Sequence, residues 1–191
     1  MPPTIADNWL RLLTEAQHAR HHIGPFLQAG GLRNPILDTL VPSLLQVKAV
    51  GLLDDALKAT IAQRGVKMPG KYDRTLGGRI AFLHDQGVID GTEADIQREL
   101  RNNIGHEFEP RISREQFDGV ATTIQTLLES LGYVGPRPDL KVLWDRIPHI
   151  PGRDGAVVSF DIAQRVVLDG LDVSRVVWHI DNLSPFSAAP E

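Results

Sequence analysis

The chain has 191 residues, of which 42% are hydrophobic and 23% are charged, and it has no cysteine and a formal net charge of −4. This length and composition predict one folded domain, or one domain with a small appendage, and exclude disulfides and cysteine-ligated zinc sites. No apolar run is long enough to cross a bilayer and the N-terminus does not resemble a signal peptide, so we expect a cytoplasmic protein with no membrane contact.

The N-terminal third predicts two helical segments. Asp7 is the expected N-cap of the first, whose apolar residues fall mostly at helical spacing. Asn34-Pro35 is the expected start of the second, because a capping residue is followed by proline at the first helical position. A kink or break is expected at Pro42, and the helix should stop near Gly65.

Two more helices are predicted in the middle of the chain. Asp73 is the expected cap of the first and Gly87 its stop. The second should start around Thr92 and end before Pro110. Apolar residues four positions apart predict its buried face: Ile96, Leu100 and Ile104.

The last predicted helix has the clearest signals in the chain. Ser113 and Gln116 match a capping box, and Gly132 follows a regular amphipathic pattern. Taken together, residues 5–132 predict an antiparallel helical bundle with short loops, so the fold class is mainly α.

The composition changes after the bundle. Four prolines in residues 133–153 predict an irregular connection, and residues 154–183 predict a small β or α/β appendage. Within it, "AVVSFDI" and "SRVVWHID" have the β-branched pattern of strands, while "DIAQRVVLDG" between them fits a strand or a short helix. Residues 184–191 are expected to form a loose tail.

One polar stretch, "ELRNNIGHEFEPR" at residues 99–111, stands out near the end of the predicted bundle. Arg101, Asn102 and His106 fall outside its predicted apolar stripe, so packing does not require them. An arginine followed by a polar residue, with a histidine after a short spacing and inside a small helical bundle, resembles the signature of the HEPN superfamily (higher eukaryotes and prokaryotes nucleotide-binding).

This resemblance implies a metal-independent endoribonuclease, commonly a toxin with a cognate antitoxin or an antiviral defence effector, which acts as a homodimer on RNA. Arg101 would bind and stabilise the phosphate, His106 would transfer the proton, and Asn102 would orient the histidine or contact the substrate. The resemblance implies no cofactor and no metal, and the chain has none of the common ATPase, dinucleotide-binding, zincin or serine hydrolase motifs.

The spacing of this motif carries a geometric condition. Five helical steps rotate by about 500°, so Arg101 and His106 would point about 140° apart on one straight helix. Either the helix breaks at Gly105, or two copies of the motif converge. The alternative is a non-catalytic module that binds RNA, a nucleotide or a protein, in which Arg101 is a solvated helix residue paired with Glu99 or Asp95.

A local excess of positive charge precedes the motif. Residues 64–79 have five basic residues against Asp73, a net charge of 5 − 1 = +4, and could hold an RNA backbone. An ordinary solvated connection is the alternative. The candidate RNA-binding residues are Arg64, Lys67, Lys71, Arg74 and Arg79.

Three histidines near the end of the first predicted helix form the other candidate. His18, His21 and His22 have a spacing that could present imidazoles to a metal, but Glu15 is the one carboxylate beside them. A solvated or partner-facing surface fits them better. In an RNA-binding dimer, these histidines and Arg20 could contact phosphate instead.

Overall fold

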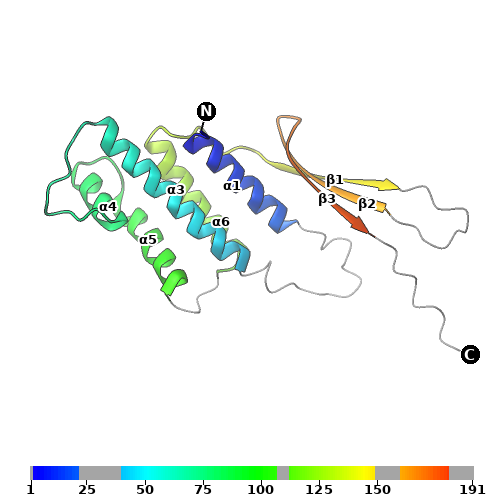
Figure 1. Cartoon of the computed structure of the whole chain (residues 1–191), viewed down its shortest axis with the longest axis horizontal. Helices are drawn as coiled ribbons and strands as arrows, with labels where there is room; N and C mark the ends of the chain where they lie inside the picture. Colours follow the sequence, from blue (N-terminus) through cyan, green and yellow to red (C-terminus); the bar gives the residue numbers. More distant parts are fainter. Residues whose placement is uncertain (1, 22–39, 107–111, 149–159, 181–191) are drawn as a thin grey trace, which may run out of the picture.

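A computed structural model describes residues 2–21, 40–106, 112–148 and 160–180. The predicted helix start at Asn34-Pro35, the stop at Pro110, His22 and the tail 184–191 lie outside these residues. What is described is mainly helical, with a small antiparallel sheet near the C-terminus (Figure 1). The helical part consists of α1 (Ile5–Arg20), α3 (Val41–Gln63), α4 (Leu76–Asp85), α5 (Gly91–His106) and α6 (Arg114–Ser130).

The start of α1 differs from the prediction by one turn. Thr4 is the N-cap, and its hydroxyl accepts from the Asp7 N–H at 3.1 Å. The Asp7 carboxylate accepts from the Thr4 N–H at 2.8 Å, which completes a capping box. Asp7 therefore occupies the third helical position, not the cap.

The described part of α3 begins at Val41, so Pro42 lies in its first turn; the residues just before Leu40 lie outside the described ranges, and the kink or break expected at Pro42 stays a prediction. Proline is tolerated there because the N–H groups of a first turn have no partner within the helix. The predicted stop is confirmed, since Gly65 follows the helix with a φ of +63°.

A short α-hairpin of α4 and α5 carries the candidate motif. The N-cap of α4 is Thr75 and not the predicted Asp73. The Asp73 carboxylate instead accepts a hydrogen bond from the Thr75 N–H at 3.1 Å. Gly87, with a φ of +65°, confirms the predicted stop of α4. The Gly91 N–H at the start of α5 donates to His84 Nδ1 at 3.1 Å, so this ring caps the second helix.

The helix α6 follows its sequence signals throughout. Ser113 and Gln116 form the predicted capping box, and Gly132 follows the helix with a φ of +77°. One buried face of α6 packs on α1 and α3, where the indole N–H of Trp9 donates to the Gln125 side-chain oxygen. Gln125 also donates to the Gly135 carbonyl at 2.8 Å, which ties the following segment to the helical part.

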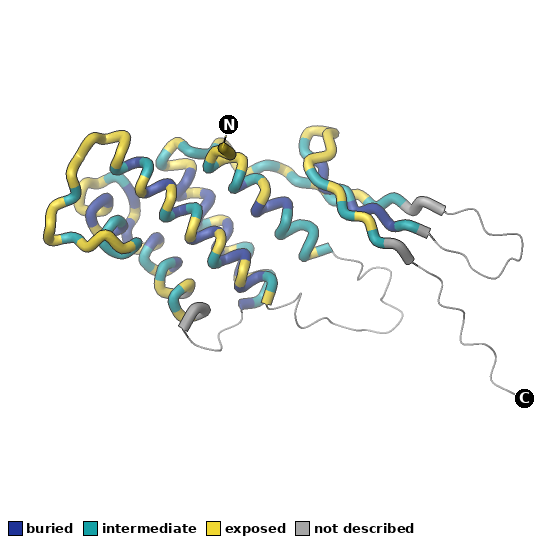
Figure 2. Tube along the Cα trace, in the orientation of Figure 1, coloured by how far each residue is buried: buried dark blue, intermediate teal, exposed yellow. Residues whose placement is uncertain are grey.

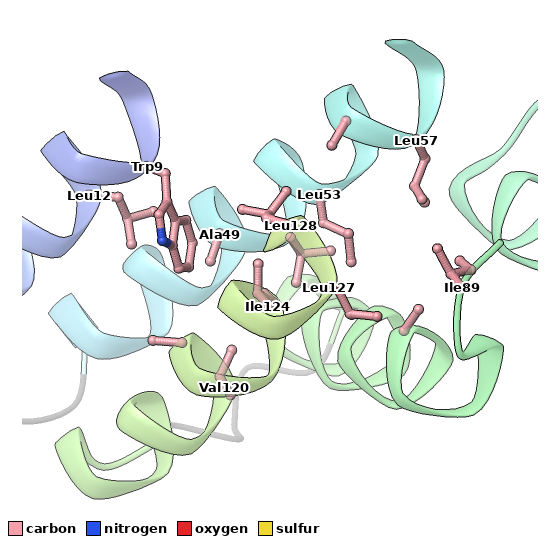
Figure 3. Close-up of a cluster of buried hydrophobic side chains, with 14 of the residues drawn as sticks. Trp9, Leu12, Ala49, Leu53, Leu57, Ile89, Val120, Ile124, Leu127 and Leu128 are labelled. Atoms are coloured by element: carbon pink, nitrogen blue, oxygen red, sulfur yellow. The ribbon is translucent and has the colours of Figure 1, made fainter. Parts of the chain in front are cut away.

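One hydrophobic core lies among the helices, with α3 at its centre. Figure 2 shows buried residues along the inward sides of α1, α3 and α6. Figure 3 shows side chains from α1, α3 and α6 meeting there, with Ile89 from the α4–α5 connection at one end. The fully covered side chains include Leu12, Leu53, Leu57, Ile124 and Leu128. None of the described helices is long and apolar enough to cross a membrane.

The C-terminal strands form one antiparallel sheet in the order β1-β2-β3. Their bounds are β1 (Lys141–Pro148), β2 (Phe160–Leu168) and β3 (Leu171–Ile180). The segment 133–153, predicted to be irregular throughout, thus contains β1. The segment whose sequence fitted either a strand or a short helix is β2. A turn at Asp169-Gly170, with φ values of 51° and 82°, connects β2 to β3.

Glycine substitutions in two helices test the close packing at the start of α4. A Cβ on Gly78 of α4 would overlap the Asp73 carbonyl oxygen, whereas a Cβ on Gly51 of α3 meets nothing within 4 Å. Gly78→Ala should lower the free energy of unfolding by about 1–3 kcal/mol because backbone must move. Gly51→Ala should raise it by about 0.5–1 kcal/mol through helix propensity. Urea unfolding measures both, and equal changes would contradict the close packing.

Candidate functional site

The helix α5 is continuous from Gly91 to His106, so it does not break at Gly105. Arg101, Asn102 and His106 therefore all lie on one helix, in its last turns. At about 100° per residue, Arg101 and His106 leave the helix axis about 140° apart. The side chain of His106 is outside the described part of the structure, which gives only its place on the helix.

The Arg101 side chain is exposed, and its Nη1 donates to Asn102 Oδ1 at 3.1 Å. The acidic neighbours that could have neutralised it are held by another arginine. Arg98 Nε lies 2.5 Å from Asp95 Oδ1, and Arg98 Nη2 lies 3.5 Å from Glu99 Oε1. The hydrogen bond that Arg98 donates to Asp95 raises the pKa of Arg98. Among the described residues, Arg101 thus keeps its charge toward solvent with a neutral amide as its partner.

The packed face of α5 runs directly toward Arg101. Ala94 and Gln97 are 0% and 6% exposed, and they precede Arg101 by two turns and one turn. Ile96, predicted on the buried face, is instead 50% exposed, and the burial of Leu100 and Ile104 lies outside the described part of the structure. Arg101 is exposed although it continues the row of Ala94 and Gln97, so burial along this row ends between Gln97 and Arg101.

Gln97 gives this boundary a polar character. Its Oε1 is buried and has no hydrogen-bond partner among the described residues. An unsatisfied buried acceptor costs about 1–3 kcal/mol, so helix packing alone does not favour a glutamine there. Gln97 precedes Arg101 by one helical turn, so its side-chain acceptor lies toward the same end of α5.

Asn102 is half-buried and accepts the bond from Arg101. It also precedes His106 by four residues, so the two are neighbours on the helix surface. The carboxamide therefore contacts Arg101 and lies one turn before the position of His106 on the helix.

The predicted RNA-binding residues fall into two groups. Arg64, Lys67 and Arg74 are exposed, and Lys71 is an exposed residue with its Nζ 3.7 Å from Asp85 Oδ2. Arg79 differs, because it is held within the helical part.

Arg79 Nε and Nη2 lie 2.7 and 2.6 Å from Asp54 Oδ1, and its side chain is 13% exposed. This ion pair ties α4 to α3, so Arg79 has a structural role and is not available to RNA. This pairing could not be predicted from neighbouring residues, because Asp54 lies on another helix.

The C-terminal end of the basic segment, residues 64–79, lies close to α5. A Cβ on Gly77 would lie 3.4 Å from Arg98 Cδ, so the first turn of α4 rests on the α5 residue that precedes Arg101 by three positions. Between the two helices, residues including Asp73, Ile96 and Glu99 line an open groove of about 650 Å³.

Of the three histidines, His18 and His21 are described and His22 is not, so no site shared by all three is described. His18 Nδ1 lies 2.8 Å from Gln164 Oε1 and its Nε2 lies 2.9 Å from Ser174 Oγ. Both ring nitrogens therefore attach α1 to the sheet, and a metal would have to displace one of these bonds. His21 has its pKa lowered by burial and then by the charges of Arg20 and Arg114. No group of three metal-ligating side chains occurs within the described ranges.

Comparisons with protein-family models, with curated proteins and with solved structures find no match to this chain.

The His18 contacts predict a measurable link between α1 and the sheet. His18→Ala leaves the Gln164 oxygen, on a side chain that is 0% exposed, without its partner and should cost about 1–3 kcal/mol in unfolding free energy. Adding Gln164→Leu should recover part of this loss, because no buried acceptor then remains unpaired. Urea unfolding of the three variants measures the effect, and a His18→Ala protein as stable as wild type would contradict it.

Proposed function

We propose that this protein is an HEPN-like, metal-independent endoribonuclease whose helical part is an HEPN-like bundle. The observation that carries the proposal is the exposed Arg101 guanidinium, bonded to Asn102 while Arg98 takes the neighbouring carboxylates. A helix residue paired with Glu99 or Asp95, which was the structural alternative, does not fit these contacts.

The proposed reaction needs only groups that this chain and RNA supply. The RNA 2′-OH attacks the adjacent phosphorus and gives its proton to a base, while the leaving 5′-oxygen receives a proton. His106 performs proton transfer, since imidazole changes charge near neutral pH. Arg101 stabilises the added negative charge of the pentacovalent phosphorus. The products carry a 2′,3′-cyclic phosphate and a free 5′-hydroxyl.

The proposal requires a homodimer. Because α5 stays helical through Gly105, one copy directs Arg101 and His106 about 140° apart and cannot close both around one phosphate. In a dimer, the arginine of one copy can meet the histidine of the other across a shared cleft. Asn102 then holds Arg101 in one orientation within its own copy.

On this proposal the protein acts as a toxin or an antiviral defence effector, held in check by an antitoxin or another protein partner. The alternative is a non-catalytic HEPN-like module that binds RNA, a nucleotide or a protein. The two are separated by whether purified protein cuts RNA and by which residues the cutting needs.

Alanine substitutions test the chemistry. Arg101→Ala and His106→Ala should each abolish cleavage of total RNA, and wild-type cleavage should be equal with and without EDTA. The matched control is Arg11→Ala, which removes an exposed charge outside α5 at a residue with no proposed contact to RNA. Circular dichroism checks folding, and mapping of the cut ends checks for cyclic phosphate. Variants that cut like wild type would refute the catalytic roles, and wild-type protein that cuts nothing would favour the binding module.

A further inference from the structure

Guanidinium groups from three segments gather at the seam between α1 and α6. Arg20 is the last residue of α1, Arg114 is the first of α6, and Arg137 lies in the segment that follows α6. All three line one partly enclosed cavity of about 30 Å³. Its apolar wall includes Leu13, Ala16, Pro42, Leu45, Phe117 and Leu140.

Contacts within the protein hold these arginines in place. Arg20 Nη2 pairs with the Asp118 carboxylate. Arg114 Nη1 donates to the Arg20 carbonyl oxygen at 2.8 Å, and Arg137 Nη1 donates to Thr122 Oγ1 at 2.8 Å. A guanidinium has five N–H donors, so a bond to one hydroxyl leaves Arg137 able to bind an oxyanion.

Positive charge exceeds negative charge around this cavity. Among the described residues that line it, Asp118 is the one carboxylate against three arginines, and Glu115 lies within electrostatic reach of Arg114 and Arg20, so the net charge is 3 − 2 = +1. The neighbouring His21 has its pKa lowered by burial and then by the charges of Arg20 and Arg114. The N-terminus of α6, capped by Ser113, adds to this potential.

The size of the cavity limits how a ligand can use it. A volume of about 30 Å³ holds about two water molecules. An anion of phosphate size therefore sits at the arginine rim, where planar guanidinium groups can bond two of its oxygens at once.

We propose that Arg20, Arg114 and Arg137 form a phosphate-binding site, with an RNA backbone as its source. This choice of RNA over a free nucleotide rests on the proposed function. Residues 107–113 are all that separates the motif-bearing end of α5 from Arg114, and the C-terminal ends of α1 and α5 lie on the same side of the helical part (Figure 1). An RNA strand held at the motif can therefore place a flanking phosphate at the seam.

Binding of 2′-O-methyl RNA tests the site without cleavage, because this RNA lacks the attacking hydroxyl. Arg137→Gln should weaken binding of a short fluorescein-labelled oligonucleotide about five-fold at ~0.1 M salt and reduce the slope of log K against log salt by about 0.7. Arg114→Gln with Arg137→Gln should do more. Arg11→Gln is the control, since it removes the same charge from an exposed residue of α1 and should change neither quantity.

A second arm identifies the source of the phosphate. If 5′-AMP and inorganic phosphate bind wild type but not the double variant, while RNA binding is equal in both, the site exists and serves a free phosphate. If neither RNA nor the small anions distinguish the arginine variants from Arg11→Gln, the site is refuted.

The outcome is separable from that of the proposed function. Loss of RNA binding in Arg137→Gln with no cleavage by wild type keeps the site and removes the nuclease. Cleavage that depends on Arg101 and His106, with full RNA binding by Arg137→Gln, would support the nuclease and refute RNA binding at the seam.

Discussion

The unbroken helix α5 is the constraint on which the rest of the site depends. Its hydrogen-bonded backbone carries Arg101 and His106 on different sides, and nothing in the last turns lets one copy bring them together. The hairpin with α4 fixes where this helix starts, through the His84 ring on the Gly91 N–H. Packing around Ala94 and Gln97 fixes how it lies, and along this row burial ends before Arg101. The result is a rigid helix with an exposed polar end.

The arginines near the exposed end of α5 differ in the groups that they contact. Arg79 and Arg98 are bound to carboxylates of the helical part, so they stabilise packing and offer little to a ligand. Arg101 is bonded to an amide, and three arginines at the seam of α1 and α6 face the two carboxylates Glu115 and Asp118. Because the chain is negative overall, binding of phosphate would depend on such local groups of cations.

The local signals of the sequence predicted much of the fold, and the non-local contacts escaped it. The capping box of α6 and the glycine stops depend on residues a few positions apart, so they could be read directly. Ile96 was misplaced because a four-residue apolar spacing defines a row but not which row is covered. The strand β1 was missed because prolines flank it, and its pairing partner Phe160–Leu168 lies far along the chain. Arg79 and His18 were misread for the same reason.

Mixing two inactive variants tests the dimeric site most directly. In a heterodimer of Arg101→Ala and His106→Ala, one cleft combines the arginine of one copy with the histidine of the other. If the site is shared, equal mixing after subunit exchange should restore about a quarter of the wild-type cleavage rate, because half of the dimers have one intact cleft of two. No recovery, with heterodimers demonstrated, would contradict a site assembled from two copies of α5.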